Sequence, residues 1–415
     1  MFNIAKEFAP PFRLIAPFFV AGVVFYLLSM AALLFYSPDF HFSELSVAGW
    51  VHLFLLGYVM MIIFGAMAQL VPVVLETGHF SVDWYYVIFP LLLLGTIGLI
   101  VGFWLDPIVL SFGGVLVLAA MIIFAVDVFL TIKKTELDSI TVKAVKVSNI
   151  FLLLGILSGF LLALTLSGFL SVDIDEILKA HVFAVVGGYV LITIYGISLV
   201  LLPMFGLAHG FDERPVHIAF RLMIWAVGLV FAGSFLGLSF LNQIGYLLSL
   251  ASVGFYFYQI WLIYKTRVRK ELDIWYKSML FGYASFVLAA LLGFIYILSG
   301  ATLERALHGA FWFLFVFFAF LINGHLYKIV PFLVWFHRFS PLVGKQKVPM
   351  LHEMYPRRQA EFEFWFSAAG ALLVGVALLV GSEELFKAGA SFLFVGAIFL
   401  ATSVKWMLNF RSDNG

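Results

Sequence analysis

Three histidines of this chain occupy equivalent positions in three long apolar runs. Each lies near the start of its run, and a proline follows 20, 22 or 23 residues later. The histidine–proline pairs are His52 with Pro72, His181 with Pro203 and His308 with Pro331. The three histidine-bearing runs begin about 130 residues apart, and such a regular spacing is typical of an internal repeat. Because imidazole binds metals and protons, this repeated pattern is the first candidate for chemistry.

The composition places these histidines in a membrane. The chain has 415 residues, of which 64% are hydrophobic and 11% are charged. That much apolar surface exceeds what a soluble core of this length hides, so the chain is expected to use lipid as its solvent. The net charge of +1 gives no indication of nucleic acid, and the absence of cysteine excludes disulfides and thiolate metal sites. Histidine therefore remains the main ligand type.

The apolar runs predict twelve membrane-spanning helices, because each run approaches or exceeds the ~20 residues needed to cross the hydrocarbon. The runs are Leu14–Tyr36, Val47–Leu75, Trp84–Leu105, Ile108–Ile132, Val145–Leu170, Ile177–Phe205, Val216–Leu236, Phe240–Tyr264, Met279–Leu298, Leu307–Phe336, Phe364–Val380 and Leu385–Leu408. We expect an all-α polytopic membrane protein with pseudo-threefold symmetry. It would form one transmembrane domain, 1–415, with four-helix repeats at about 1–135, 136–270 and 271–415. The first run is expected to be retained, since no cleavage site follows it.

Charged residues between the runs predict the orientation. Lys and Arg dominate alternate connections, and Asp and Glu dominate the others. By the positive-inside bias, both termini are cytoplasmic and the protein lies in the cell membrane, the inner one where there are two. His52, His181 and His308 then lie in one layer about 5–10 Å below the outer surface. Three buried imidazoles at one depth indicate a common ligand or a shared polar network, whereas any one alone is more simply explained by a bond to a nearby carbonyl.

Few ionisable residues fall inside the runs, so no proton relay across the membrane is expected. Asp127 lies close to the cytoplasmic end of the fourth run, and His41 and His79 are interpreted as lone loop residues. The segment 337–362 is predicted to be the longest connection, polar and cytoplasmic.

Two of the runs resemble helices of a known family. The second run has His52 early and ends in LVPVVLETG, and the tenth reads LHGAFWFLFVFFAFLINGHLYKIVP. With twelve spans and both termini inside, the chain resembles subunit I of the haem–copper oxidase superfamily. The resemblance implies that His52 and His308 are the axial ligands of a low-spin haem, of b type. It also implies that Arg305, one turn before His308, pairs with a haem propionate.

The chain also departs from that family. Ala306 stands where catalytic members carry the ligand of the high-spin haem, and the seventh run offers only His217 where they carry two copper ligands. His181 remains at the place of a copper ligand of the sixth span. Oxygen or nitric oxide reduction in the usual form is therefore not expected. No catalytic residue is assigned, and whether the protein is an enzyme, which would then be an oxidoreductase, stays open.

A second resemblance concerns the sixth run. The stretch AHVFAVVGGYVLITIYG and the later pair His209-Gly210 are similar to the NnrS family of haem- and copper-containing membrane proteins. Trp50 and the segment Pro203–Ala208 stand where that family has further ligand motifs. This resemblance implies haem and, secondarily, copper as cofactors.

These observations favour a haem-binding membrane protein that carries electrons or binds or responds to a diatomic gas, NO or O2. His52 and His308 are the expected haem ligands, Arg305 the propionate partner and His181 a third metal ligand or neighbour. The expected partners are the lipid bilayer and a redox protein or respiratory subunit, with no nucleic acid. The alternative is a transporter that uses the histidine layer as a metal or proton site. A third class is a structural or assembly partner of a respiratory complex.

Overall fold

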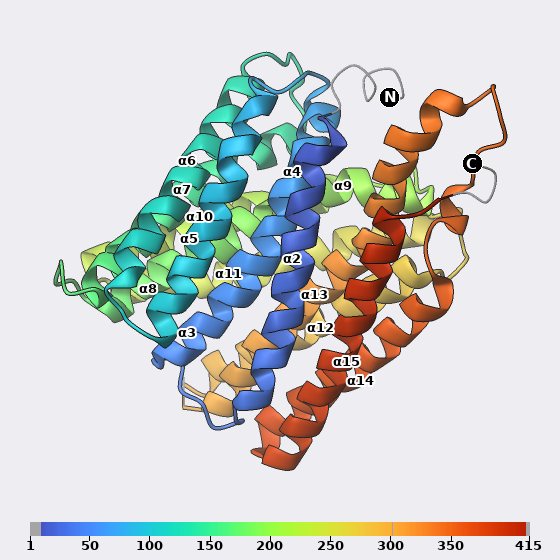
Figure 1. Ribbon diagram of the computed structural model, residues 1–415. Helices are drawn as coiled ribbons and strands as arrows, with labels where there is room; N and C mark the ends of the chain where they lie inside the picture. Colours follow the sequence, from blue (N-terminus) through green and yellow to red (C-terminus); the bar gives the residue numbers. More distant parts are fainter. Residues whose placement is uncertain (1–9, 301, 412–415) are drawn as a thin grey trace. The chain divides into compact units, whose positions relative to one another are not determined.

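The computed structural model describes residues 10–300 and 302–411 and is all-helical in this part of the chain, without a β-strand (Figure 1). Twelve helices are long and apolar enough to cross a membrane, as the sequence predicts. Eleven of them are between 23 and 33 residues long, and the tenth, Glu304–Leu342, has 39 residues. The chain is therefore a multi-pass membrane protein. In hydrocarbon only helices or closed barrels satisfy every backbone group, which explains why apolar runs of this length fold into helices.

The chain forms two compact units, and the boundary between them falls inside the second span. Unit 1 consists mainly of Ala66–Glu271, and unit 2 of Pro11–Gly65 with Leu272–Gly415. This division does not coincide with the three repeats expected from the sequence, and the threefold repeat stays a prediction.

Unit 2 contains the first and last spans of the chain together with the first part of the second. Its elements are α2 (Phe12–Ala32), η1 (Leu33–Phe35), α3 (Leu45–His52), the π-helix η2 (Leu53–Met60), the start of α4 (Met61–Leu75), α12 (Ile274–Leu298), α13 (Glu304–Val334), the π-helix η5 (Trp335–Phe339), η6 (Ser340–Leu342), η7 (Leu351–Glu353), α14 (Arg357–Val380) and α15 (Glu383–Leu408). Helices α14 and α15 lie side by side (Figure 1). They approach closely at Gly370 and Gly389, where a Cβ on either residue would lie within 3 Å of the other helix's backbone. Small residues at such crossings are the usual device of helix packing in membranes.

Unit 1 contains the remaining spans. Its elements are the rest of α4, η3 (Val82–Trp84), α5 (Tyr85–Trp104), α6 (Val109–Ile132), α7 (Ile140–Leu166), α8 (Ile174–Val182), the π-helix η4 (Phe183–Leu191), α9 (Ile192–Gly206), α10 (Arg214–Leu236) and α11 (Ser239–Thr266). Helices α5 and α6 form one antiparallel pair, and α10 and α11 form another.

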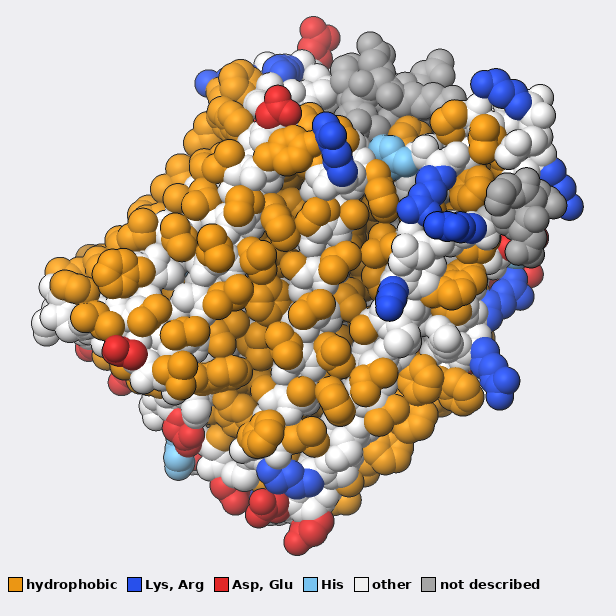
Figure 2. All heavy atoms as spheres, viewed as in Figure 1, with side chains coloured by type: hydrophobic (Ala, Val, Ile, Leu, Met, Phe, Trp, Pro, Cys, Tyr) orange, Lys and Arg blue, Asp and Glu red, His pale blue; other side chains and the backbone are white. Residues whose placement is uncertain are grey.

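Hydrophobic side chains cover the visible outer surface of the helices, and charged side chains lie near their ends (Figure 2). Exposed examples within the spans include Leu94, Trp225 and Leu291, which are 57%, 67% and 54% exposed. Apolar side chains at such positions are stable in contact with lipid, so this surface fits a membrane interior rather than water.

The sequence interpretation of the connection 337–362 is partly wrong. The tenth span continues as η5 and η6 to Leu342, and α14 already begins at Arg357. The polar connection is therefore shorter than expected, and Glu363 lies inside a membrane-spanning helix. Helical backbone satisfies its own hydrogen bonds, so a helix extends beyond the apolar run where neighbouring helices bury its polar residues.

Candidate functional site

Unit 2 has two chemically distinct ends. The acidic end is defined here by Asp39, Glu44, Glu304, Glu383 and Glu384, and the basic end by Lys277, Arg338, Lys345, Lys347, Arg357 and Arg358. Helix α13 starts at the acidic end and α14 starts at the basic end. These two names are used below.

His308 lies in the first turns of α13, at the acidic end, and is only 8% exposed. Its ring packs between two phenylalanines of the loop that joins η1 to α3, with centroid distances of 4.7 Å to Phe40 and 4.9 Å to Phe42. The buried Nδ1 atom of His308 has no hydrogen-bond partner among the described residues. A buried polar atom without a partner costs about 1–3 kcal/mol, so it marks a position where a ligand or a water molecule would be stabilising.

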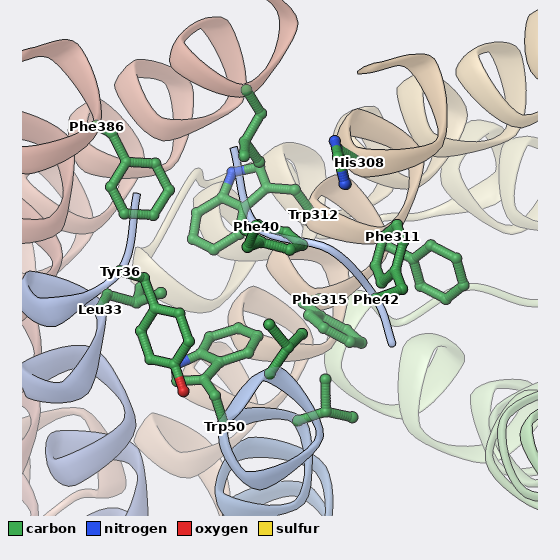
Figure 3. Close-up of a pocket in the computed structure, with 13 residues that line it drawn as sticks. Leu33, Tyr36, Phe40, Phe42, Trp50, His308, Phe311, Trp312, Phe315 and Phe386 are labelled. Atoms are coloured by element: carbon green, nitrogen blue, oxygen red, sulfur yellow. The ribbon is translucent and has the colours of Figure 1, made fainter. Parts of the chain in front are cut away.

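His308 lines a pocket whose walls are otherwise almost entirely apolar (Figure 3). The lining side chains are Leu33, Tyr36, Phe40, Phe42, Val47, Trp50, Val51, His308, Phe311, Trp312, Phe315, Leu378 and Phe386. The cavity volume is ≈ 40 Å³, enough for about one water molecule. Aromatic rings from α3, α13 and the 37–44 loop fill the remaining space.

Arg305 lies one turn before His308 on α13 and is already engaged. Its Nη2 donates to Asp39 Oδ1 at 2.9 Å, and its Nη1 donates to the Leu378 carbonyl oxygen at 3.1 Å. The side chains of the ion pair are 42% and 67% exposed. Because Asp39 precedes Phe40, this pair fastens the loop that covers His308. An exposed pair of this kind contributes only about 0–1 kcal/mol, so the pair by itself holds the loop weakly.

His52 lies on a different face of its helix from the residues that contact α13. Trp50 stacks with Trp312 at a centroid distance of 6.4 Å, and Phe54 contacts Phe315 at 5.5 Å. His52 follows Trp50 by two residues, which turns its side chain by about 200° around the helix. Its Nδ1 donates to the carbonyl oxygen of Ala48 at 2.8 Å, one turn earlier. His52 is not among the residues that line the His308 pocket.

His181 lies in unit 1, where it packs against helix α7. Its Nδ1 donates to the Gly155 carbonyl oxygen at 2.8 Å. A Cβ on Gly159 would lie 2.6 Å from the His181 Cε1 atom, so the ring fits only because this position is glycine. Among residues 10–300 and 302–411, no three His, Cys, Asp or Glu side chains are close enough to hold a metal ion. His181 belongs to unit 1, whereas His52 and His308 belong to unit 2, and a shared site of the three histidines stays a prediction.

A π-helix follows two of the three repeat histidines directly. The π-helix η2 begins at Leu53, after His52, and η4 begins at Phe183, two residues after His181. No π-helix follows His308 directly, since α13 continues to Val334 before η5 begins. Wide helical turns of this type are frequent at functional sites, and here they mark the first two copies of the pattern.

His79 is not a lone loop residue, contrary to the sequence interpretation. Its Nδ1 lies 2.7 Å from Asp127 Oδ2 and its Nε2 lies 2.8 Å from the Ala68 carbonyl oxygen, with both side chains of the pair fully buried. A carbonyl oxygen only accepts, so Nε2 carries a proton and a second proton lies between Nδ1 and the carboxyl group. Asp127 Oδ1 also accepts from the Ser81 backbone N–H at 3.0 Å. This satisfied cluster fastens the α4–η3 connection to α6 within unit 1 and has a structural role.

Glu363 is the buried ionisable residue that the sequence interpretation missed. It is 1% exposed on α14, and its Oε1 accepts from Asn323 Nδ2 at 2.9 Å and from Ser367 Oγ at 3.3 Å. Asn323, on α13, in turn accepts from the Tyr58 hydroxyl through Oδ1. The detectable signal is the four-residue spacing of Gln359, Glu363 and Ser367, which places three polar side chains on one helix face.

The fold and this arrangement define a polytopic helical membrane protein with a buried histidine at the acidic end of its tenth span. Among solved structures, one similar to this chain is a haem–copper terminal oxidase dimer determined by cryo-EM. The TM-score is 0.65 at 13% sequence identity, and the match covers 99% of this chain and 84% of the oxidase chain. No protein-family model and no curated protein sequence matches. The fold is thus similar to that of a haem–copper oxidase, as the sequence resemblance implies.

The residues beside His308 fit one side of a haem. The unpartnered Nδ1 supplies a donor atom suited to iron, and the aromatic walls supply the dry surroundings that a porphyrin requires. Phe40 and Phe42 occupy the space next to the donor, so a bound haem requires the 37–44 loop to move aside. Arg305 is the cation that the loop would then release.

Proposed function

We propose that this protein binds haem in unit 2 and uses it for electron transfer or for binding a diatomic gas. In this proposal it lies in the cell membrane with both termini in the cytoplasm, and a redox protein or respiratory subunit is its partner. The observation that carries the proposal is the buried, unpartnered Nδ1 of His308 in an aromatic pocket on this fold. The fold's similarity to a haem–copper terminal oxidase supports the choice of haem over other iron or copper groups.

His308 is the first proposed iron ligand, and His52 is the proposed second one. His52 Nδ1 donates to the Ala48 carbonyl oxygen, and histidines that bind a metal commonly donate their other ring N–H to a carbonyl oxygen in this way. Its position on the other face of the helix means that a bis-histidine site requires helix α3 to rotate. With both ligands the haem iron is an electron carrier without an open position, and with His308 alone it offers a position to a gas.

Arg305 would pair with a haem propionate after leaving Asp39, because a guanidinium binds either carboxylate in the same way. His181 remains a proposed neighbour or third ligand of the haem, and copper remains a proposed secondary cofactor. The position of the His181 ring against Gly155 and Gly159 supports neither role.

The test is a reduced-minus-oxidised optical spectrum of the purified protein, with haem quantified per chain. We expect haem in amounts equal to the protein, and its loss in His308→Ala. The matched control is His352→Ala, which removes an exposed histidine from the connection at the basic end and should keep the haem.

The same measurement on His52→Ala separates the two forms of the proposal. Loss of haem, or a change from a low-spin to a high-spin spectrum, identifies His52 as the second ligand, and an unchanged spectrum identifies His308 as the sole histidine ligand. A well-folded preparation that contains no haem and binds none when haem is added would contradict the proposal.

The transporter alternative has less support. It requires the histidine layer to form a metal or proton site, and the similarity of the fold to a haem–copper terminal oxidase favours haem instead. Metal-dependent uptake by haem-free vesicles would reverse this preference.

A further inference from the structure

The buried carboxyl group of Glu363 lies in the membrane-spanning part of unit 2 without a cationic partner. Its hydrogen bonds come from Asn323 and Ser367, both neutral. The two nearby lysines are engaged elsewhere: Lys277 with Glu361 at 2.7 Å and Lys328 with Asp273 at 2.6 Å. An isolated carboxylate is far more costly to bury than the neutral acid, so this environment favours a bound proton on Glu363.

Polar side chains connect Glu363 to the basic end of unit 2. Gln359 lies one turn nearer that end on the same face of α14, and its buried Oε1 has no hydrogen-bond partner among the described residues. Glu363 itself is six residues from the start of α14, a distance of about 9 Å along the helix. Gln359, with a water molecule bound to its Oε1, would therefore lie between Glu363 and the interface.

Toward the acidic end, the face of α14 that carries Gln359 and Glu363 becomes apolar. Beyond Ser367 every buried residue of α14 is Ala, Gly, Val or Leu, and Ala371, Val374 and Leu378 are among them. Tyr26 and Tyr58 close the network on that side, with ring centroids 4.6 Å apart, and Phe54 follows. Polar side chains of α14 thus lie between Glu363 and the basic end, and apolar ones lie on its other side.

The residues that the structure shows around Glu363 are neutral. These are Tyr26 from α2, Tyr58 from η2, Asn323 and Tyr327 from α13, Gln359 and Ser367 from α14, and Gly396 from α15. The tyrosines are the only titratable residues among them, and their hydroxyl groups are weak acids that stay neutral at physiological pH.

We propose that Glu363 is a proton-binding site that exchanges with the basic side of unit 2 through Gln359. A hydronium ion on that side gives its proton to a Glu363 carboxylate oxygen and becomes water, and release is the reverse step. The ligand is the proton itself, and no oxidant, reductant or other reactant is needed. This site lies apart from the His308 pocket and does not depend on haem.

Infrared spectroscopy of the purified, haem-free or haem-loaded protein tests this proposal. We expect the C=O stretching band of a protonated carboxyl group near neutral pH, a shift of this band in D2O and its loss as the pH is raised. The band should be absent in Glu363→Gln, which has the shape of the neutral acid. It should persist in Glu361→Gln, which changes a half-exposed carboxylate that is already paired with Lys277.

The direction of exchange is measured in vesicles with the protein in a known orientation. A pH change on the basic side should alter the Glu363 band and one on the acidic side should not, and Gln359→Leu should slow the response. If Glu363→Gln fails to fold, Tyr58→Phe serves instead, because it removes the donor to Asn323 and should shift the position of the wild-type band. A band that is missing in the wild type, retained in Glu363→Gln or insensitive to pH while the protein stays folded would overturn the proposal.

Discussion

At the scale of single residues, buried polar side chains in this chain are stabilised by partners on other segments. His79 illustrates the rule, because each ring nitrogen has its own partner and the carboxylate of Asp127 has a further backbone donor. His308 is the contrast, since its Nδ1 has none. A buried group with all its hydrogen bonds formed, such as His79, stabilises the fold. A buried polar atom without a partner, such as His308 Nδ1, indicates a binding position.

The His79–Asp127 pair gives a prediction about stability. Asp127→Ala should lower the free energy of unfolding by about 3–5 kcal/mol, because it leaves a buried imidazole and the Ser81 N–H without their acceptor. The measurement is denaturant unfolding in detergent. Asp138→Ala, which breaks an exposed pair with Lys143, is the control and should cost less than about 1 kcal/mol. Equal losses for the two variants would contradict the assigned role.

At the scale of elements, glycines decide how closely two helices approach. Helix α8 brings His181 onto α7 at Gly159, where any side chain would meet the ring. Likewise, a Cβ on Gly57 of η2 would lie 2.7 Å from the Phe25 ring of α2. Such contacts fix which residue of one helix opposes which residue of the next, and hence where each histidine lies.

The contact between α7 and α8 gives a second prediction. Gly159→Ala should destabilise the protein by about 1–3 kcal/mol through the clash with His181, and His181→Ala in the same chain should recover most of that loss. Thermal unfolding of the single and double variants measures this coupling. Gly254→Ala on α11 is the control, since nothing lies within 4 Å of its added Cβ. Additive effects of the two substitutions would show that the ring and Gly159 do not interact.

At the scale of the whole molecule, the alternating charge of the connections predicts how the chain is inserted. In unit 2 the acidic and basic ends are separated by the full length of the membrane-spanning helices. Because Lys and Arg favour the cytoplasmic side, we expect the basic end to face the cytoplasm.

The absence of cysteine makes this orientation directly measurable. A single cysteine at Lys345→Cys should react with a membrane-impermeant maleimide only after the cells are opened, whereas one at Glu383→Cys should react in intact cells. Both positions are exposed and lie in unit 2. The reverse pattern of labelling would show the opposite orientation and would move the proposed entry of protons to the outer side.

The amino-acid sequence by itself determined the membrane class, the twelve spans and the similarity of fold, because these depend on long apolar runs that have no other stable environment. It also singled out His308. Only the tertiary structure decided which side chains meet, since a helix face has no partner until another helix packs against it. That packing turned His52 away from the His308 pocket, paired His79 with Asp127 and buried Glu363 among neutral groups. The sequence also did not predict that α14 begins at Arg357, because polar residues at a helix end have the composition of a loop. Only the neighbouring helices that bury them make the helical conformation favourable.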